Sequence, residues 1–180
     1  SSPPYFNDIK ILDDYLNLDD GENALAITAN IQDDSGLSNA SLRFKNADDT
    51  DYSSHEVYIN FNEWNSLIDS NSIDNSESHF SVNELTSSNT NGNYKLIGFD
   101  TNDNSGNSVN IYRSTNWNHD TQTNELGDWN ITQLEQFRSM GIDDPNTLSF
   151  TISGEVSEDV DTDLPIINYL SIADRDLDFS

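Results

Sequence analysis

Short blocks of alternating apolar and polar residues are the feature that most limits what this chain can fold into. Along residues 24–32, the apolar side chains of Leu25, Ile27 and Ile31 fall on alternate positions. A period of two is typical of a β-strand with one buried face. Similar blocks recur near residues 9–18, 40–44, 57–61, 80–82, 94–99, 109–111 and 148–152. With Gly-containing turns between them, they predict roughly eight short strands and an all-β, antiparallel sandwich with long polar loops.

Composition raises one alternative to a folded domain. The 180 residues carry 33 Asp or Glu and only 7 Lys or Arg, a net charge of −26, and 33% are hydrophobic. Low hydrophobicity with high net charge is the signature of disorder. The alternating blocks and an aromatic content of 10% favour a folded domain instead. Because such a charge repels itself, we expect the fold to rely on bound cations or on ambient salt.

The same charge excludes several partners. A phosphate backbone requires Lys and Arg to displace its counterions, so we expect no nucleic-acid binding. Anionic membranes are disfavoured for the same reason, and no apolar run approaches the roughly 20 residues that span a bilayer. The chain has no Cys, which excludes disulfides, zinc–thiolate sites and cysteine nucleophiles.

One segment has a helical spacing. Ile131, Leu134, Phe137 and Met140 are three residues apart, which predicts one short helix near 132–140 that packs on the sheet. Thr132 and Glu135 fit a capping box, and Gly141 is a suitable C-terminal stop. The region 62–79 stays open between a loop and a helical turn.

The end of the chain repeats its beginning. Placing Pro4 on Pro165 aligns residues 4–11 with 165–172, with identical Pro, Asn and Ile and apolar residues at matching positions. This echo predicts a domain over 1–154, an acidic linker over 155–163, and the first strand of a following repeat over 164–180. The alternative is that the last segment is a strand exchanged with an identical subunit.

Catalytic motifs are not apparent. The three histidines share no ligand spacing, and neither a nucleophile elbow nor a phosphate loop occurs. Abundant carboxylates make any single acidic pair uninformative. We therefore expect a protein that is not an enzyme.

Calcium is the metal that these residues suit, because it takes six to eight oxygen ligands from carboxylates, carbonyls and Asn amides. Three polar segments supply such oxygens: a strand end with its following loop, a second turn, and the acidic linker. The candidate ligands are Asp100, Asn102, Asp103, Asn104, Asn107, Asp33, Asp34, Glu158, Asp159, Asp161 and Asp163. The alternative is that the loops are solvated, or held by Asx-turns in which side chains bond to the backbone.

Two tryptophans suggest glycan contact. Trp117 and Trp129 bracket a polar loop, and aromatic rings flanked by Asn and Asp suit carbohydrate faces. The alternative for both is packing in the core or in a lid.

Two turns resemble those of a known group. Two runs resemble bacterial immunoglobulin-like and cadherin-like repeats of large extracellular surface or adhesin-type proteins. They are 24–37, which contains Asp33-Asp34-Ser35-Gly36, and 98–107, which contains Asp103-Asn104-Ser105-Gly106-Asn107. The resemblance implies a Greek-key sandwich, a tandem arrangement and calcium at domain junctions. Residues 100–104 also resemble the cadherin D-x-N-D-N calcium pattern. Long insertions at 46–79 and 113–146 depart from the compact family domain.

Together these features predict a non-enzymatic structural or adhesive module of an extracellular bacterial surface protein, stiffened by calcium. Its partners would be neighbouring repeats or identical subunits, and glycans are a further candidate. Two alternatives remain: the subunit of a filament built by strand exchange, and a carbohydrate-binding accessory domain of a secreted hydrolase.

Overall fold

The computed structural model describes residues 3–21, 24–48, 56–62, 66–67, 76–85, 90–120 and 123–154. Their strands, in chain order, are β1 (Tyr5–Ile11), β2 (Tyr15–Asn17), β3 (Ala24–Gln32), β4 (Leu37–Asn46), β5 (Glu56–Asn62), β6 (Ser66–Leu67), β7 (Ser76–Glu84), β8 (Gly92–Asp103), β9 (Ser108–Tyr112), β10 (Thr115–Asn118), β11 (Thr123–Leu126) and β12 (Ser149–Ser153). The helical elements of this part are η1 (Leu18–Asp20), α1 (Ile131–Ser139) and η3 (Pro145–Thr147). The predicted all-β character is confirmed.

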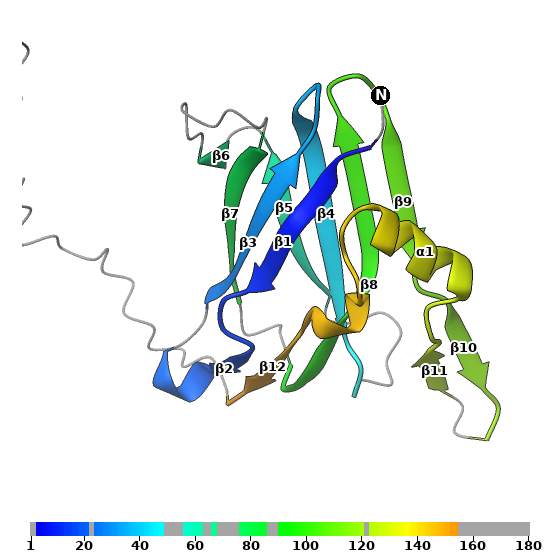
Figure 1. The fold of residues 1–180 in the computed structure, drawn as a ribbon. Helices are drawn as coiled ribbons and strands as arrows, with labels where there is room; N and C mark the ends of the chain where they lie inside the picture. The colour runs from blue at the N-terminus through cyan, green and yellow to red at the C-terminus, as the bar shows by residue number, and fades with distance from the viewer. Residues whose placement is uncertain are drawn as a thin grey trace, which may run out of the picture.

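Two larger sheets face each other, with β1 and β3 in front of β4 and β8 (Figure 1). The first has the order β1-β3-β7-β6, and the second has the order β2-β12-β8-β4-β5. Strand β8 is long enough to pair with β12 along its first half and with β9 along its second half. A separate hairpin joins β10 to β11.

The sequence pattern predicted wholly antiparallel sheets, and one pair of strands departs from this prediction. Strand β2 pairs with β12 in parallel, with Leu16 opposite Ile152. These two strands come from opposite ends of the domain, so no tight turn imposes an antiparallel direction on them. Residue alternation reports which face is buried and carries no information on strand direction.

The core lies between the two sheets and is formed by the alternating residues of the predicted strands. Leu25, Ile27 and Ile31 of β3 are buried, as are Leu42 and Phe44 of β4. Each such side chain stabilises the fold by about 1.5–3 kcal/mol relative to exposure to water. Aromatic rings join the layers: Phe99 of β8 lies edge-on to Phe6 of β1, with ring centroids 5.0 Å apart.

The predicted helix is present, one residue earlier than expected. It begins after Asn130, whose side chain accepts from the backbone N of Gln133 while the Gln133 side chain accepts from the backbone N of Asn130. The capping box therefore uses Asn130 and Gln133, and its assignment to Thr132 and Glu135 was wrong. Both pairs fit the spacing rule. Trp129, the residue just before the cap, is buried in the core.

The helix end agrees with the sequence. Gly141 follows it with φ +87°, a left-handed conformation that favours glycine. A Cβ at this position would lie 2.4 Å from the carbonyl oxygen of Phe6, so the close approach of β1 also requires glycine. Phe137 is fully buried against the sheets, which confirms the predicted packing face of α1.

Other expectations are only partly covered by the described residues. In the region 62–79, residues 66–67 form β6 and pair with β7, so a strand lies where a helical turn was an option. Residues 63–65 and 68–75 lie outside the described residues. The predicted linker 155–163 and repeated segment 164–180 also lie outside them.

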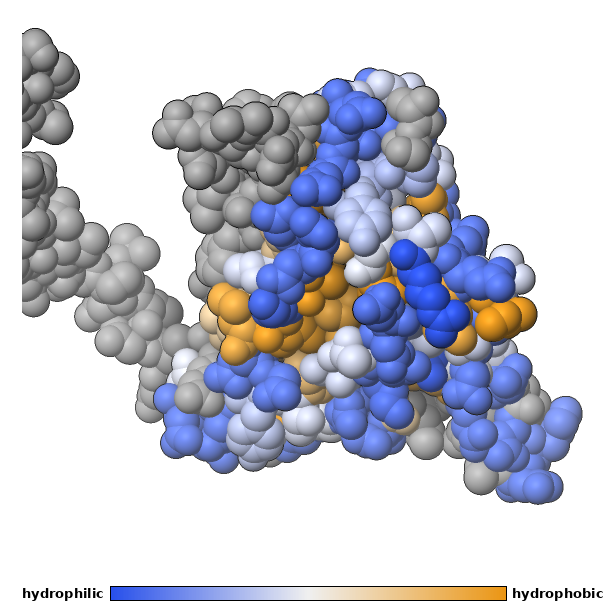
Figure 2. Space-filling view, in the orientation of Figure 1, coloured by the Kyte–Doolittle hydropathy of each residue, from blue (hydrophilic) through white to orange (hydrophobic). Residues whose placement is uncertain are grey.

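The path of the chain runs through the domain from end to end. β1 starts at the end that carries the β3–β4 and β8–β9 turns, and β12 lies toward the opposite end beside β2 (Figure 1). Figure 2 shows an apolar band across the middle of the same view, bordered by hydrophilic residues. A pocket of about 230 Å³ lies beside β1 and is lined by Ile9, Ile11 and Leu148, among others.

Candidate functional site

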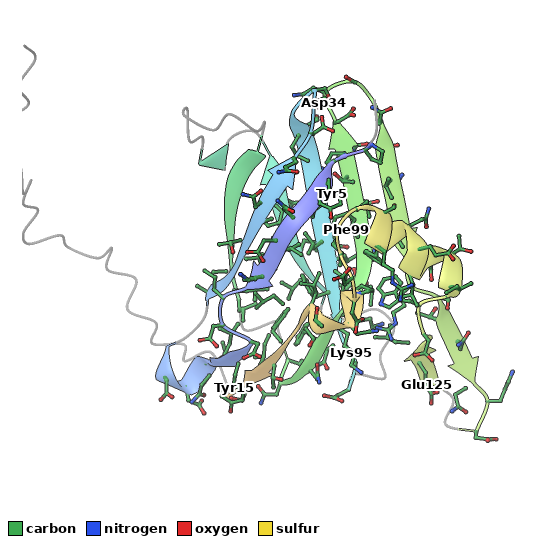
Figure 3. All side chains as sticks on the ribbon, viewed as in Figure 1. Tyr5, Tyr15, Asp34, Lys95, Phe99 and Glu125 are labelled. Carbon is green, nitrogen blue, oxygen red and sulfur yellow. The ribbon has the colours of Figure 1, made fainter. Side chains whose placement is uncertain are left out.

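Two of the polar segments singled out in the sequence meet in the structure. The turn at 33–36 joins β3 to β4, and the turn at 103–107 joins β8 to β9. The backbone N of Asn104 donates to the carbonyl oxygen of Gly36 at 3.0 Å, and its side-chain Nδ2 donates to that of Ser35 at 3.1 Å. Asp34 stands at the tip of this end of the molecule (Figure 3). The adjacency follows from the β4–β8 pairing, which the sequence did not predict.

Within these turns, carboxylates hold the backbone. Asp103 is 3% exposed; its Oδ1 accepts from the backbone N of Asn107 at 2.7 Å, and its Oδ2 accepts from Nδ2 of Asn107. Burial raises the pKa of Asp103, but the bonds from Asn107 and from backbone amides lower it, and the net pKa lies below its usual value. Asp33 likewise accepts from the backbone N of Ser35 at 2.8 Å and from its hydroxyl at 2.7 Å. These are the Asx-type bonds that stood as the alternative to calcium.

The other candidate ligands are distributed differently. Strand alternation places Asp100 and Asn102 on the face of β8 opposite to Asp103, and Asp100 accepts from the hydroxyl of Tyr112. Asp100 and Asn102 therefore lie on the other side of β8 from Asp103, and calcium binding by residues 100–107 stays a prediction. Over the described ranges, no group of three or more His, Asp or Glu is arranged to hold a metal ion. Glu158, Asp159, Asp161 and Asp163 lie outside the described residues, so calcium in the linker stays a prediction.

The two tryptophans are not an exposed pair. Trp129 is 6% exposed; its ring lies edge-on to Phe137 at 5.0 Å, and the guanidinium of Arg113 lies 5.4 Å from its centroid. A sugar has no access to that ring, so Trp129 follows the alternative of core packing. Trp117 lies in β10, where its backbone pairs with Asn124, and its side chain lies outside the described part of the structure.

A site that the sequence did not single out lies on the outer face of the larger sheet. A pocket of about 560 Å³ opens there, and we name it the Arg43 pocket. Its described lining residues are Arg43, Lys45, Glu56, Ile97, Tyr112, Arg113 and Thr115. Three of the seven Lys and Arg of the chain therefore converge on one pocket of a protein whose net charge is −26.

Neighbouring strands fix the Arg43 side chain. Its Nε donates to Glu56 of β5, and the hydroxyl of Tyr58 donates to the same carboxylate at 2.8 Å. The guanidinium also lies over the Tyr58 ring, 5.4 Å from its centroid. Burial raises the pKa of Glu56, but the bonds from Arg43 and Tyr58 outweigh it and hold that pKa below its usual value. The bond to Glu56 in turn raises the pKa of Arg43, which stays charged.

A glycine positions the aromatic ring of the pocket. Gly98 lies between Arg43 on β4 and Tyr112 on β9. A Cβ at Gly98 would lie 2.9 Å from Cδ1 and Cε1 of the Tyr112 ring, so only glycine lets the ring lie over β8. Tyr112 remains 48% exposed, and its hydroxyl is fixed by Asp100. This bond is the main cause that raises the pKa of Tyr112.

The sequence contains a weak indication of this pocket. Arg43 and Lys45 are two residues apart, so a strand places both on one face, and the chain has few other cations. The approach of Arg113 depends on the pairing of β8 with β9, in which the backbone N of Arg113 donates to the carbonyl oxygen of Ile97 at 2.7 Å. Register of this kind cannot be read from alternation alone.

Comparison of the chain with protein-family models, with curated proteins and with solved structures finds no match. No helix among the described residues has the length and apolar character needed to cross a membrane.

Proposed function

We propose that this chain is a non-enzymatic structural and adhesive module, joined end to end with similar modules in an extracellular bacterial surface protein. The observation that carries this proposal is the path of the chain, which enters at one end of the two packed sheets and reaches β12 toward the other. Successive units with this path stack lengthwise without a long connection. An immunoglobulin-like Greek-key topology of the sheets is part of the same proposal.

The sequence echo supplies the continuation. If residues 165–172 start a second unit as residues 4–11 start the first, the acids of 155–163 fall at the junction between units. Clustered carboxylates at a junction repel one another, and calcium neutralises them while fixing the angle between the neighbours. In this proposal the calcium ligands are Glu158, Asp159, Asp161 and Asp163.

A chain of two units tests this function. The units are joined so that Pro165 of the first serves as Pro4 of the second. We expect calcium to raise the melting temperature and to narrow the range of shapes seen by small-angle X-ray scattering, relative to chelator. The matched control replaces the linker acids with their amides: Glu158→Gln, Asp159→Asn, Asp161→Asn and Asp163→Asn. Stability and shape that do not respond to calcium in the unaltered chain would contradict the proposal.

Strand exchange between subunits is the second candidate, and the position of β1 favours it. Among the described strands, β1 lies at the edge of its sheet, and the 230 Å³ pocket lined by Ile9, Ile11 and Leu148 lies beside it. An edge strand accepts an added strand through its main chain, with side-chain pockets that select the sequence. The segment 165–172 of a second copy matches β1 in its apolar positions and is the occupant we propose.

Two substitutions separate this candidate from the first. Ile167 aligns with Phe6, which is fully buried, whereas Tyr169 aligns with Asp8, which is exposed. For strand exchange, Ile167→Asp abolishes the oligomers seen by sedimentation velocity, and Tyr169→Asp leaves them unchanged. A protein that sediments as a monomer at all concentrations removes this candidate.

A further inference from the structure

The Arg43 pocket concentrates positive charge where the rest of the chain carries little. Among the described lining residues, Arg43, Lys45 and Arg113 bring three cations and Glu56 one carboxylate, and the carboxylate of Asp128 lies 3.8 Å from Arg113. The convergence of the three cations on one concave surface makes that surface attractive to an anion, although the molecule as a whole repels anions.

Two of the cations of the pocket are held by neighbouring groups before any ligand arrives. Arg43 is held by Glu56 and lies over Tyr58. Nε of Arg113 donates to the carbonyl oxygen of Gly127, and its guanidinium lies over Trp129. Because these long side chains are already fixed by the fold, binding costs little side-chain entropy.

The burial of Arg113 and its distance from a carboxylate also favour a bound anion. Its side chain is 7% exposed, and among the described residues the carboxylate of Asp128 lies 3.8 Å from it, beyond hydrogen-bond distance. Burial lowers the pKa of Arg113 against the weaker opposing effect of Asp128. A buried cation with such a distant partner is stabilised by an anion that reaches it.

The size of the pocket and the surrounding charge limit the anion to a short one. At about 560 Å³ the pocket matches the volumes of small-molecule sites. A long polyanion would extend over an acidic surface, whereas a ligand with one charge interacts within the roughly 8 Å that physiological salt leaves unscreened. An acidic segment of a second copy would bring that copy's charge of −26 with it.

The remaining walls suit a sugar ring. Tyr112 leaves about half of its surface exposed above Gly98, and Ile97 adds an apolar contact. Aromatic faces stack on the apolar face of a pyranose, and Arg pairs with a carboxylate through two hydrogen bonds. We propose that the Arg43 pocket binds a carboxylate-bearing pyranose, such as a hexuronate at the end of a glycan. This inference goes beyond the proposed end-to-end arrangement of modules. Either proposal can fail while the other holds.

The test is a titration of the single, full chain, labelled with ¹⁵N and followed by NMR. The probe is methyl β-D-glucuronide, and its neutral counterpart is methyl β-D-glucoside. We expect the glucuronide to shift the amide signals of residues 43, 97–98 and 112–113 saturably, and to bind at least about tenfold more tightly than the glucoside. Raising the salt to about 0.5 M weakens this binding in the unaltered protein, because the attraction is electrostatic.

A pair of charge variants assigns the binding to the pocket. Arg43→Gln weakens glucuronide binding at least about tenfold. The matched control is Lys10→Gln, which removes one positive charge from β1 in the other sheet, where Lys10 pairs with Asp8. It leaves the affinity within about twofold on the same scale. The salt dependence is measured on the unaltered chain, so the test stands even if Arg43→Gln does not fold.

Three outcomes would overturn the inference. The first is the absence of saturable shifts at these residues. The second is equal binding of glucoside and glucuronide, or of acetate and glucuronide, since the latter assigns the pocket to anions in general. The third is self-association that Arg43→Gln abolishes, which assigns the pocket to an acidic segment of a second copy.

Discussion

At the scale of single residues, the carboxylates of Asp33 and Asp103, in the β3–β4 and β8–β9 turns, act mainly on their own turns. Asp103 shows this most clearly, because both of its oxygens accept from Asn107 while the side chain is almost wholly buried. Asp103 thereby holds the turn in the structure, while its role as a metal ligand stays a prediction. Its contribution to stability has a definite dependence on pH.

Asp103→Asn tests that dependence. The amide group places a donor opposite Nδ2 of Asn107, so we expect a lower urea midpoint at neutral pH. In the folded protein the pKa of Asp103 lies below its ordinary 3.8, so its stabilisation is present above that value and is lost as pH falls through the folded pKa. The difference between unaltered protein and variant should narrow between about pH 5 and pH 2.

Asp34→Asn, in the exposed tip of the neighbouring turn, is the control and should show a much smaller difference. A gap between Asp103→Asn and the unaltered protein that stays constant with pH would show that the carboxylate charge does not matter.

At the same scale, the sequence predicted which segments form turns better than it predicted which side chains are buried. The Asp-Ser-Gly and Asp-Asn-Ser-Gly-Asn segments are turns, as their composition indicates. Trp129 and Arg113 are packed together in the domain because α1 folds back on the sheets, a contact between distant parts of the structure. Local sequence carries no record of such a contact, which is why the tryptophan looked available to a ligand.

At the scale of elements, alternation predicted the longer strands well. β3, β4, β5, β8 and β12 lie where one face of each block is apolar. The hairpin β10–β11 was missed because its residues are almost all polar, so its pairing leaves no periodic signal. The direction of β2 was missed because three residues carry no information on their partner.

The start of α1 offers a test that discriminates between two capping boxes. Asn130→Ala removes the acceptor for the backbone N of Gln133 and should lower the free energy of unfolding by about 1 kcal/mol. Thr132→Ala, at the position that sequence reasoning chose, should change it by less than about 0.5 kcal/mol. Urea denaturation monitored by circular dichroism measures both. The reverse order of effects would mean that the helix begins later than in the structure.

At the scale of the whole molecule, charge is the dominant variable. A net charge of −26 destabilises a compact state through self-repulsion. The cations that oppose it are few, and three of them line a single pocket. Screening of the repulsion between surface carboxylates therefore depends mainly on ions from the solvent.

We expect the melting temperature to rise with NaCl between about 0.01 and 1 M, because the Debye length falls from about 30 to about 3 Å. Differential scanning calorimetry measures this rise. Calcium chloride at matched ionic strength should raise it further if the linker binds calcium, and the amide variant of the linker acids should abolish only that additional rise. A melting temperature that is constant or falls with NaCl would contradict the role given to self-repulsion.

The entry and exit of the chain also determine how the domain would respond to a mechanical load. β1 starts at one end of the molecule and runs toward the other alongside β3, with Tyr5 opposite Gln32 and Ile11 opposite Ile27. A pull applied at its first residue is directed largely along the strand, so it strains the hydrogen bonds of the ladder together in shear instead of opening them one at a time. In the proposed end-to-end series of such domains, the chain would then lengthen in steps, each at the force that separates one β1 from its neighbouring strand β3.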